Sequence, residues 1–461
     1  MLTNLDFLRE GEKFPPASET TRLTMYSNNR ALFETQHAEV YKEDMKRIER
    51  VIGNFSEVIS YPVVLNFQKL MSLKLADLLL GEQPEISAKD DTGQEAIGNI
   101  IKQSDLYNTA YQIAVDVSRF GDGLFYVRDK GGYGKVGMTQ PSIWFPVVSP
   151  DDIKEIVYHI IAYKTSENEL SVKIHAKGSY EERIYRVDND IIMGLKGSRV
   201  VNTGLDDFAV VQVSNVITSD RVTGLDDYTD VDSIISELMV RVGQISRVLD
   251  KHASPSVSGP ASALTKDETT GEWRIVLGNY FKRDSMDDPP VEYLTWDGQL
   301  AANFQQIEKL TNYLYTISEM GSALFGDMTN NTGTATSGTA LRRLMMSPLA
   351  KVGRLKNRFD PALKKAIALC SQLGGMKLSE DEITISWKDG LPNDEKEQAE
   401  IMSIRTGGKA TISQFSAVKS LDDMNDEAAQ AELDMIQQEE SMLNPFTQPN
   451  IGGTDEPPEG E

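Results

Sequence analysis

Apolar residues recur at intervals of three and four positions in several stretches, which is the spacing of helices that pack on one face. The clearest stripe consists of Val64, Phe67, Leu70, Met71, Leu75 and Leu78. Gly81 is predicted to end this helix, and Pro84 prevents its resumption. Comparable stripes predict helices at about 40–55, 92–119, 229–251 and 301–319. Thr229 or Asp230 can serve as the N-cap of the helix at 229–251.

Between residues 123 and 216 the apolar period shortens toward two. Short aromatic or β-branched runs, separated by Gly, Pro, Asp and Asn, predict strands there. These runs are GLFYVRD, SIWFPVVS, EIVYHIIAYKT, LSVKIHAK, ERIYRVDN and FAVVQVSNV. They indicate a small antiparallel sheet region. EWRIVLGNYF and PVEYLTW form a second, short β-like insert between the helices at 229–251 and 301–319, and EITISWKD predicts one further strand.

The segment from Thr329 to Thr339 contains only Thr, Asn, Gly, Ala and Ser, and a long apolar stripe follows it from about Gly338. Pro348 lies inside this stripe, and we expect a kink because its ring removes a backbone donor and clashes with the carbonyl of Leu344. Asp360 and Pro361 are predicted to cap and restart a helix that continues through Cys370. Helices are expected at about 394–404 and 412–440, and the composition of the last residues predicts disorder.

Composition narrows the class of protein. The 461 residues are 40% hydrophobic and 25% charged, which is ordinary for a globular chain. The sequence has no apolar run of membrane-spanning length and no basic N-terminal region followed by an apolar block, so we expect neither a membrane anchor nor a signal peptide. One cysteine and four scattered histidines argue against a disulfide framework and against zinc, and we interpret Cys370 as a small buried hydrophobe.

The net charge of −23 argues against a simple nucleic-acid groove binder, which should be basic. The charge is uneven: residues 338–370 carry eight Lys or Arg against one Asp, whereas residues 389–461 carry 17 Asp or Glu against four Lys or Arg. Two interpretations stay open. The basic helix either pairs with acidic neighbours inside the fold, which we favour, or forms a polyanion site.

No catalytic motif stands out. Gly333 and Gly338 have the spacing of a phosphate-binding loop, but Thr339 stands where its lysine would be. The pairs Asp151-Asp152, Asp226-Asp227 and Asp422-Asp423 are interpreted as loop or cap positions rather than metal ligands. The insert holds an aromatic cluster of Trp273, Tyr280, Phe281, Tyr293 and Trp296. These side chains could stack on bases, but a subdomain core or an oligomer interface is the favoured reading.

The order of these elements resembles the portal proteins of tailed bacteriophages, in the family common among long-tailed phages of Gram-positive hosts. The resemblance is carried by five segments spread over about 60–440. They are NFQKLMSLKLADLLLGEQP, FGDGLFYVRD, FAVVQVSNVITSDRVTGLDDYTDVDSIISELMVRV, SGTALRRLMMSPLAKVGRLKNRF and ISWKDGLPNDEKEQAEIMSIRTGGKATISQFSAV. No single motif is decisive, and the collinear series supports the match. The first 55 residues match poorly.

The resemblance implies a predominantly helical α+β portal fold. Its parts would be an N-terminal arm (1–55), a wing (56–228), stem helices (229–251 and 301–319) around a small α/β clip (252–300), a tunnel loop (320–338), a long kinked helix with the wing return (339–393), a helical crown (394–440) and a disordered acidic tail (441–461). The tunnel loop would present Asp327, Thr329, Asn330, Asn331, Thr332, Thr334, Thr336 and Ser337 to DNA. Pro348 would mark the kink, and the aromatic cluster would form the clip interface.

The resemblance also implies function. Portal proteins form a ring, normally of twelve copies, at one vertex of the virion capsid, and the ring assembles in the bacterial cytoplasm. Double-stranded DNA passes through it during packaging and ejection, pumped by a separate ATP-driven terminase, and no cofactor or catalysis is expected. The implied partners are the terminase large subunit, the major capsid and scaffolding proteins and a head-tail adaptor. Alternatives are a non-channel structural scaffold, a head-tail adaptor protein, or a nucleotide-driven motor, although the last lacks a phosphate cradle.

The small polar residues of the tunnel loop have a physical interpretation on this hypothesis. Hydroxyl and amide groups hydrogen-bond phosphates modestly, whereas a ring of arginines would bind by counterion release and stall a moving strand. Glycine adds backbone freedom. A strongly acidic ring would further discourage DNA from adhering to its walls.

Overall fold

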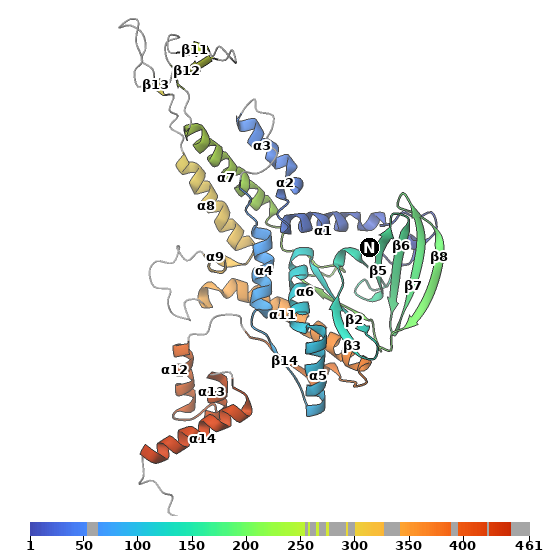
Figure 1. Cartoon of the computed structure of the whole chain (residues 1–461), viewed down its shortest axis with the longest axis vertical. Helices are drawn as coiled ribbons and strands as arrows, with labels where there is room; N and C mark the ends of the chain where they lie inside the picture. The colour runs from blue at the N-terminus through green and yellow to red at the C-terminus, as the bar shows by residue number, and fades with distance from the viewer. Residues whose placement is uncertain are drawn as a thin grey trace, which may run out of the picture. The chain divides into compact units, whose positions relative to one another are not determined.

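The computed structural model describes residues 1–52, 63–253, 257–258, 264–266, 273–275, 292–293, 300–326, 342–388, 395–421 and 424–443. The chain divides into two compact units, one of residues 1–328 and 344–390 and one of residues 329–343 and 391–461. The described residues form a mixed α+β structure with more helix than strand, so the expected fold class is confirmed (Figure 1).

The first unit contains a five-stranded antiparallel sheet in which sequence neighbours pair in the order β4-β5-β6-β7-β8 (Figure 1). The strands are β4 (Trp144–Val148), β5 (Ile156–Ser166), β6 (Glu169–Ala176), β7 (Ser179–Asp188) and β8 (Ile191–Asn202). β8 was not predicted. Most of its residues are exposed and two are glycines, so it lacks the alternation that a half-buried strand shows.

The N-terminal segment covers one face of this sheet. Leu2 makes a parallel bridge to Val147 in β4, and the Phe14 amide donates to the carbonyl of Asp190 next to β8, at 2.8 Å. Between these two edges, Phe7 and Leu8 of the 3₁₀ turn Asp6–Leu8 are buried against the sheet with Leu2 and Phe14. The segment therefore completes the core of the sheet, a role that sequence similarity alone did not predict for residues 1–55.

A smaller antiparallel sheet has the order β3-β2-β9, with β2 (Asp122–Asp129) between β3 (Gly134–Met138) and β9 (Val210–Ser214). Helices α6 (Leu106–Phe120) and α11 (Met346–Leu373) both contact this sheet. Two short strands from distant parts of the chain, β1 (Glu85–Ala88) and β14 (Ile383–Ser386), pair antiparallel with Glu85 opposite Ser386. The strand predicted from EITISWKD is thus confirmed.

The remaining helices of the first unit are α1 (Thr20–Phe33), α2 (His37–Val40), α3 (Lys42–Ile52), α4 (Phe67–Leu80), α5 (Asp91–Ser104), α7 (Asp232–Ala253), α8 (Leu300–Ile317) and α9 (Gly321–Leu324). α7 and α8 lie side by side, and α3 packs along α7 (Figure 1). Arg47 of α3 forms an ion pair with Glu237 of α7 at 2.6 Å. Gly81 ends α4 as predicted, and the Asn66 side chain caps its start.

Two helix predictions in the first unit were wrong. The expected helix at 92–119 is interrupted at Asp105, which has a left-handed backbone (φ 47°) and separates α5 from α6. Asp tolerates this conformation better than most residues. Pro361 does not restart a helix, because α11 continues through it from Met346 to Leu373. Asp360 instead accepts a hydrogen bond from the Trp387 indole at 2.8 Å.

Four short strands lie between α7 and α8: β10 (Val257–Ser258), β11 (Leu264–Lys266), β12 (Trp273–Ile275) and β13 (Glu292–Tyr293). β10 pairs with β13 and β11 pairs with β12, so the β-like insert forms two hairpin-like ladders. Of the predicted clip interface, Trp273 pairs with Lys266 and Tyr293 pairs with Val257 through the backbone. Tyr280, Phe281 and Trp296 lie outside the described residues.

The second unit contains α12 (Glu395–Thr406), α13 (Gln414–Leu421) and α14 (Asp426–Leu443). The single helix predicted at 412–440 is therefore two helices that pack on each other. Asn425 explains the new start, because its side-chain oxygen accepts a hydrogen bond from the Ala428 amide at 2.8 Å and so caps α14. Ala417 and Ala429 are buried.

Candidate functional site at the base of the helix pair

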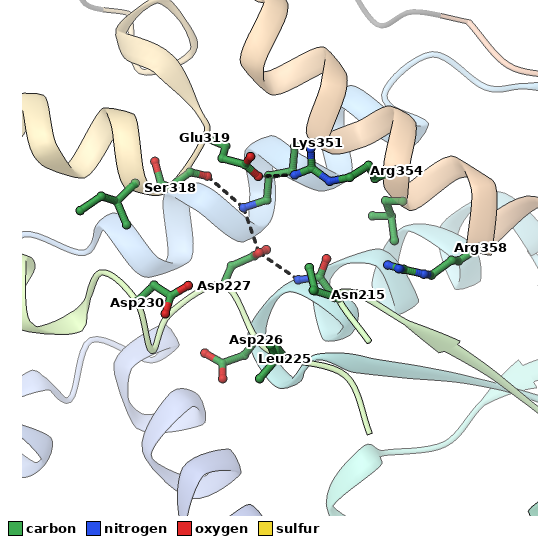
Figure 2. A pocket seen from close by; sticks show the side chains of 13 residues that line it. Asn215, Leu225, Asp226, Asp227, Asp230, Ser318, Glu319, Lys351, Arg354 and Arg358 are labelled. Carbon is green, nitrogen blue, oxygen red and sulfur yellow. Dashed lines mark hydrogen bonds and ion pairs between the residues drawn. The ribbon is translucent and has the colours of Figure 1, made fainter. Parts of the chain in front are cut away.

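The residues predicted to contact DNA, Asp327, Thr329, Asn330, Asn331, Thr332, Thr334, Thr336 and Ser337, lie outside the described residues. The structure does describe the elements on either side of this segment along the chain. α8 and α9 precede it, and α11 begins shortly after it. The base of the α7–α8 pair, the loop that leads into α7, and α11 meet at one buried polar cluster (Figure 2).

Asp227 is the centre of this cluster. Its carboxylate accepts hydrogen bonds from Ser118 Oγ at 2.6 Å and from Asn215 Nδ2 at 2.9 Å. Its backbone amide donates to the Ser118 carbonyl at 2.9 Å. The carboxylate is thus held by α6 and by the residue that follows β9, which fixes the loop leading into α7.

Lys351 of α11 completes the cluster. Its Nζ lies 2.9 Å from Asp227 Oδ1 and donates to the Ser318 carbonyl, at the end of α8, at 3.0 Å (Figure 2). A buried ammonium needs such partners, because leaving it unpaired would cost several kcal/mol (roughly 3–5). One lysine therefore ties α11 to both the end of α8 and the loop before α7.

A second contact holds the turn between α8 and α9. Arg354, one helical turn after Lys351, forms an ion pair with Glu319 (Figure 2). Glu319 and Gly321 both have left-handed backbones, with φ of 59° and 66°, and reverse the chain between the two helices. A Cβ at Gly321 would lie 3.5 Å from the Leu344 carbonyl oxygen and 3.8 Å from the Pro348 ring, so α9 and the start of α11 are close neighbours.

An aromatic contact fixes the residue that follows α9. The Phe325 ring stacks on Tyr315 of α8 with centroids 5.2 Å apart, and meets Phe67 of α4 edge-on at 5.9 Å. Phe325 lies two residues before Asp327. Phe325, which leads toward Asp327, is therefore packed against α8 and α4.

Pro348 lies in the first turn of α11, and the helical backbone is interrupted at Met345, just before α11 begins. The first amides of a helix have no intrahelical acceptor, so a proline there removes no hydrogen bond. Its ring packs near Gly321 rather than bending an uninterrupted helix.

Another buried network adjoins the start of α7. Gln68 Nε2 and the Tyr41 hydroxyl both donate to Asp232 Oδ1, at 2.9 and 2.8 Å, and Gln68 also contacts His37 Nε2 at 3.1 Å. Burial raises the pKa of the Asp232 carboxyl to about 6, although these hydrogen bonds oppose the rise. This network connects α2 and α4 to the first residue of α7.

Lys351 was not identified from the sequence. A signal existed, because Lys351 falls on the apolar stripe of α11 next to Val352 and Leu355, where a charge requires a buried partner. Asp226 and Asp227 were interpreted as structural, which agrees with their contacts: Asp226 accepts hydrogen bonds from the amides of Tyr228 and Thr229. Four basic residues of 338–370 pair with acids inside the fold: Lys351 with Asp227, Arg354 with Glu319, Lys364 with Asp360 and Lys365 with Asp207.

Cys370 is buried in α11, and burial raises the pKa of its thiol to about 12, which supports the interpretation as a small hydrophobe. Within the described ranges, no three His, Cys, Asp or Glu side chains gather as metal ligands would. Nor does any helix in these ranges have the length and apolar character needed to cross a membrane.

Buried polar contacts tie these helices together, and this arrangement suits a structural protein. The sequence identifies which kind. Residues 62–445 match the family model for phage portal protein, SPP1 Gp6-like. Because the match covers most of the chain, the protein belongs to this phage portal family.

Solved structures with distant similarity are components of gene transfer agent particles. A chain in the virion of the native gene transfer agent particle has 10% identity and a TM-score of 0.46. Chains in the neck of the native particle, computed with C12 symmetry, and in the neck of the empty particle, computed with C6 symmetry, have 13% and 12% identity and TM-scores of 0.43 and 0.45. Each alignment covers 77% of this chain and 89% of the other.

TM-scores below 0.5 at such identities do not establish a shared fold, so the family assignment rests on the sequence match. No curated protein sequence matches the chain.

Proposed function

We propose that copies of this chain form a closed ring, normally of twelve, at one vertex of a phage capsid, and that double-stranded DNA passes through it during packaging and ejection. The observation that carries this proposal is membership of the portal family over residues 62–445. The ring would dock the terminase large subunit and a head-tail adaptor, and would contact the major capsid and scaffolding proteins.

In this proposal, α7 and α8 are the stem helices and the insert between them is the clip. Residues 1–55, which include α1 to α3, are the N-terminal arm, and the sheets and helices of 56–228 belong to the wing. α11 is the long wing helix, and α12 to α14 belong to the crown. The segment from about 320 to 338 is the tunnel loop. The order of α8, α9, the low-complexity segment and α11 along the chain supports this assignment.

The buried cluster around Asp227 and Lys351 supports the tunnel-loop assignment in particular. A loop that contacts moving DNA experiences force, and its two ends need fixed positions. Lys351 bonds to the end of α8 and to the loop before α7, and Phe325 stacks on α8. These contacts would transmit the force to the stem and wing rather than let the loop be pulled through the channel.

The chain's net charge of −23 fits a conduit rather than a binder, because an acidic wall repels the DNA phosphates and keeps contacts brief. The role proposed is structural, with ATP hydrolysis supplied by the terminase.

Electron microscopy of the purified full-length chain tests the proposal. Closed rings with an axial hole are expected. Open, hole-less particles or stable monomers at all protein concentrations would favour a non-channel scaffold or adaptor instead. Isothermal titration with ATP, expected to show no binding, separates the portal from a nucleotide-driven motor.

A further inference from the structure

A small pocket opens beside the Asp227–Lys351 cluster, between the loop before α7, the end of α8, and α11. Its volume is about 120 Å³, and its polar lining includes Asp226, Asp227, Lys351, Arg354 and Arg358 (Figure 2). Ligand pockets usually measure about 300–1,000 Å³. This pocket is therefore too small for a nucleotide but large enough for an amino-acid side chain.

Three apolar side chains at the pocket are partly exposed. Val216, Leu225 and Ile317 line it and are 41%, 37% and 49% exposed. Val216 and Leu225 face each other across an isolated antiparallel bridge, so the backbone holds this apolar pair in place. Three exposed aliphatic side chains around a hollow resemble the apolar centre of a protein–protein contact more than a solvated surface.

Most charged side chains in the pocket have a hydrogen-bond or ion-pair partner, but Arg358 does not have one among the described residues. Asp227 pairs with Lys351, Glu319 pairs with Arg354, and Asp226 accepts backbone and hydroxyl hydrogen bonds from Tyr228 and Thr229. Arg358 is partly buried and extends toward Asn215, yet within the described residues it has no hydrogen-bond or ion-pair partner (Figure 2). A guanidinium that has lost part of its hydration without gaining an acceptor favours an incoming carboxylate.

We propose that this pocket is a socket for a second copy of the chain, which inserts one side chain against Val216, Leu225 and Ile317 and places a carboxylate on Arg358. This inference rests on the proposed ring. In a closed ring, one face of each copy meets a different face of the next, so every socket would be filled by its neighbour.

Two observations favour a second copy over other occupants. The chain carries 70 Asp or Glu against 47 Lys or Arg, so a neighbouring copy offers carboxylates in excess. DNA is disfavoured because Val216, Leu225 and Ile317, which line the pocket, offer no hydrogen-bond donors to phosphates. Arginine beside apolar contacts is also a common arrangement at the energetic centre of protein interfaces.

Thiol labelling of assembled rings tests the socket directly, because Cys370 is buried and is the only native cysteine. Val216→Cys would report on the socket, and Val200→Cys, on β8, would serve as the exposed control at 72% exposure. In an uncovered chain the two thiols should react with a maleimide at rates within about twofold to threefold of each other. In rings, we expect Val216→Cys to react at least about tenfold more slowly than Val200→Cys.

A photo-crosslinker attached at position 216 in rings mixed from isotopically light and heavy chains identifies the occupant. Crosslinked peptides that combine light and heavy chains confirm a second copy. Equal labelling of the two thiols in rings would contradict the socket. Crosslinks only within one chain, or only to an added adaptor, would also contradict it. Neither result would contradict the proposed ring. If the wild-type chain forms no rings, both the proposed function and the socket are wrong.

Substitution of Arg358 provides an independent measurement. Arg358→Ala should raise the protein concentration at which half the chain assembles by at least about tenfold. Arg199→Ala, which removes an equally charged but exposed side chain on β8, should leave that concentration unchanged. Circular dichroism confirms that each variant folds. Assembly of a folded Arg358→Ala chain at the wild-type concentration would contradict the carboxylate contact.

Discussion

Lys351 Nζ lies 2.9 Å from Asp227 Oδ1, and the two side chains are only 9% and 5% exposed. Lys351 is on α11, which follows the proposed tunnel loop, and Asp227 is on the loop before α7. The pair is thus a buried connection between the proposed long wing helix and the proposed stem. Its removal should affect stability and, on the proposed function, the position of the loop.

Lys351→Met should lower the free energy of unfolding by about 3–5 kcal/mol, because it leaves the Asp227 carboxylate buried without its cation. Denaturant unfolding measures this loss. Arg354→Met is the matched control, one turn further along α11, and breaks the pair with Glu319, whose two side chains are 50% and 43% exposed. It should cost less than about 1 kcal/mol. Equal losses in the two variants would contradict the burial argument.

Phe14→Ala should destabilise the first unit by about 3–5 kcal/mol, since Phe14 is buried against the sheet and its ring centroid lies 5.2 Å from that of Phe145. Thermal unfolding measures the effect. Glu12→Ala changes an exposed side chain in the same segment, while its backbone carbonyl still accepts from the Ile192 amide, and should be nearly neutral. If Phe14→Ala were also neutral, residues 1–16 would not complete the core of the sheet.

His175 is one of two neighbouring buried histidines that make stability depend on acid. It faces His159 on the neighbouring strand, is fully buried, and neither of its ring nitrogens has a hydrogen-bond partner among the described residues. Burial lowers the pKa of His175 to about 4 and that of His159 to about 3, and Lys173 adds to the effect on His175. Because the unfolded chain binds these protons near pH 6.5, stability should fall as the pH decreases from about 6.5 toward 4.

His175→Phe should keep the contacts with Tyr126 and Tyr180 and reduce this loss, because only His159 of the pair would then take up a proton, with little change at pH 7.5. Melting temperatures at pH 7.5 and 4.5 measure the difference. His159→Phe is the informative comparison, because it removes the acceptor of the Trp144 indole hydrogen bond at 3.1 Å. It should therefore destabilise by about 1–3 kcal/mol already at pH 7.5. An unchanged acid loss in His175→Phe would exclude His175 as its source.

Asn331→Arg tests the proposed sliding contact. A ring of added guanidinium groups should hold the DNA backbone by counterion release and slow or block genome packaging while rings still form. Asn331→Gln, which keeps an uncharged amide, should package normally. The packaged DNA per particle measures the effect, and the defect should diminish as salt is raised. Normal packaging by Asn331→Arg would exclude short-lived loop contacts as the reason for the small polar residues.

Periodicity predicted the elements whose apolar residues recur at a regular spacing. α4, α7, α8 and the strands β2, β5 and β6 lie close to where their apolar patterns indicated. The pattern was insufficient where a single backbone conformation decides the structure: Asp105 splits an apolar stripe by adopting φ of 47°, and Asn425 starts a new helix by capping it. At Pro361 a break was predicted but α11 continues, because tertiary packing of this helix outweighs the helix-breaking tendency of one proline.

The candidate site could be predicted only in part for a related reason. The low-complexity segment and the basic stripe after it are visible in the sequence. The partner of Lys351 is not, because Asp227 is 124 positions away and one of several similar acidic residues. The role of residues 1–16 was also hidden, since Leu2, Phe7 and Phe14 show no regular period and pack on a sheet formed more than a hundred residues later.

Among the described residues, the outer edge of strand β8 is paired only at its beginning, where Gly11 and Phe14 bond to Ile192 and Asp190. Further along it, Lys196 and Arg199 are held over the sheet by Glu169 and Glu182, at 2.8 and 2.9 Å. A foreign strand that docked there would have to break these pairs or bury their charges. Strand-to-strand association between separate copies along this edge is therefore disfavoured.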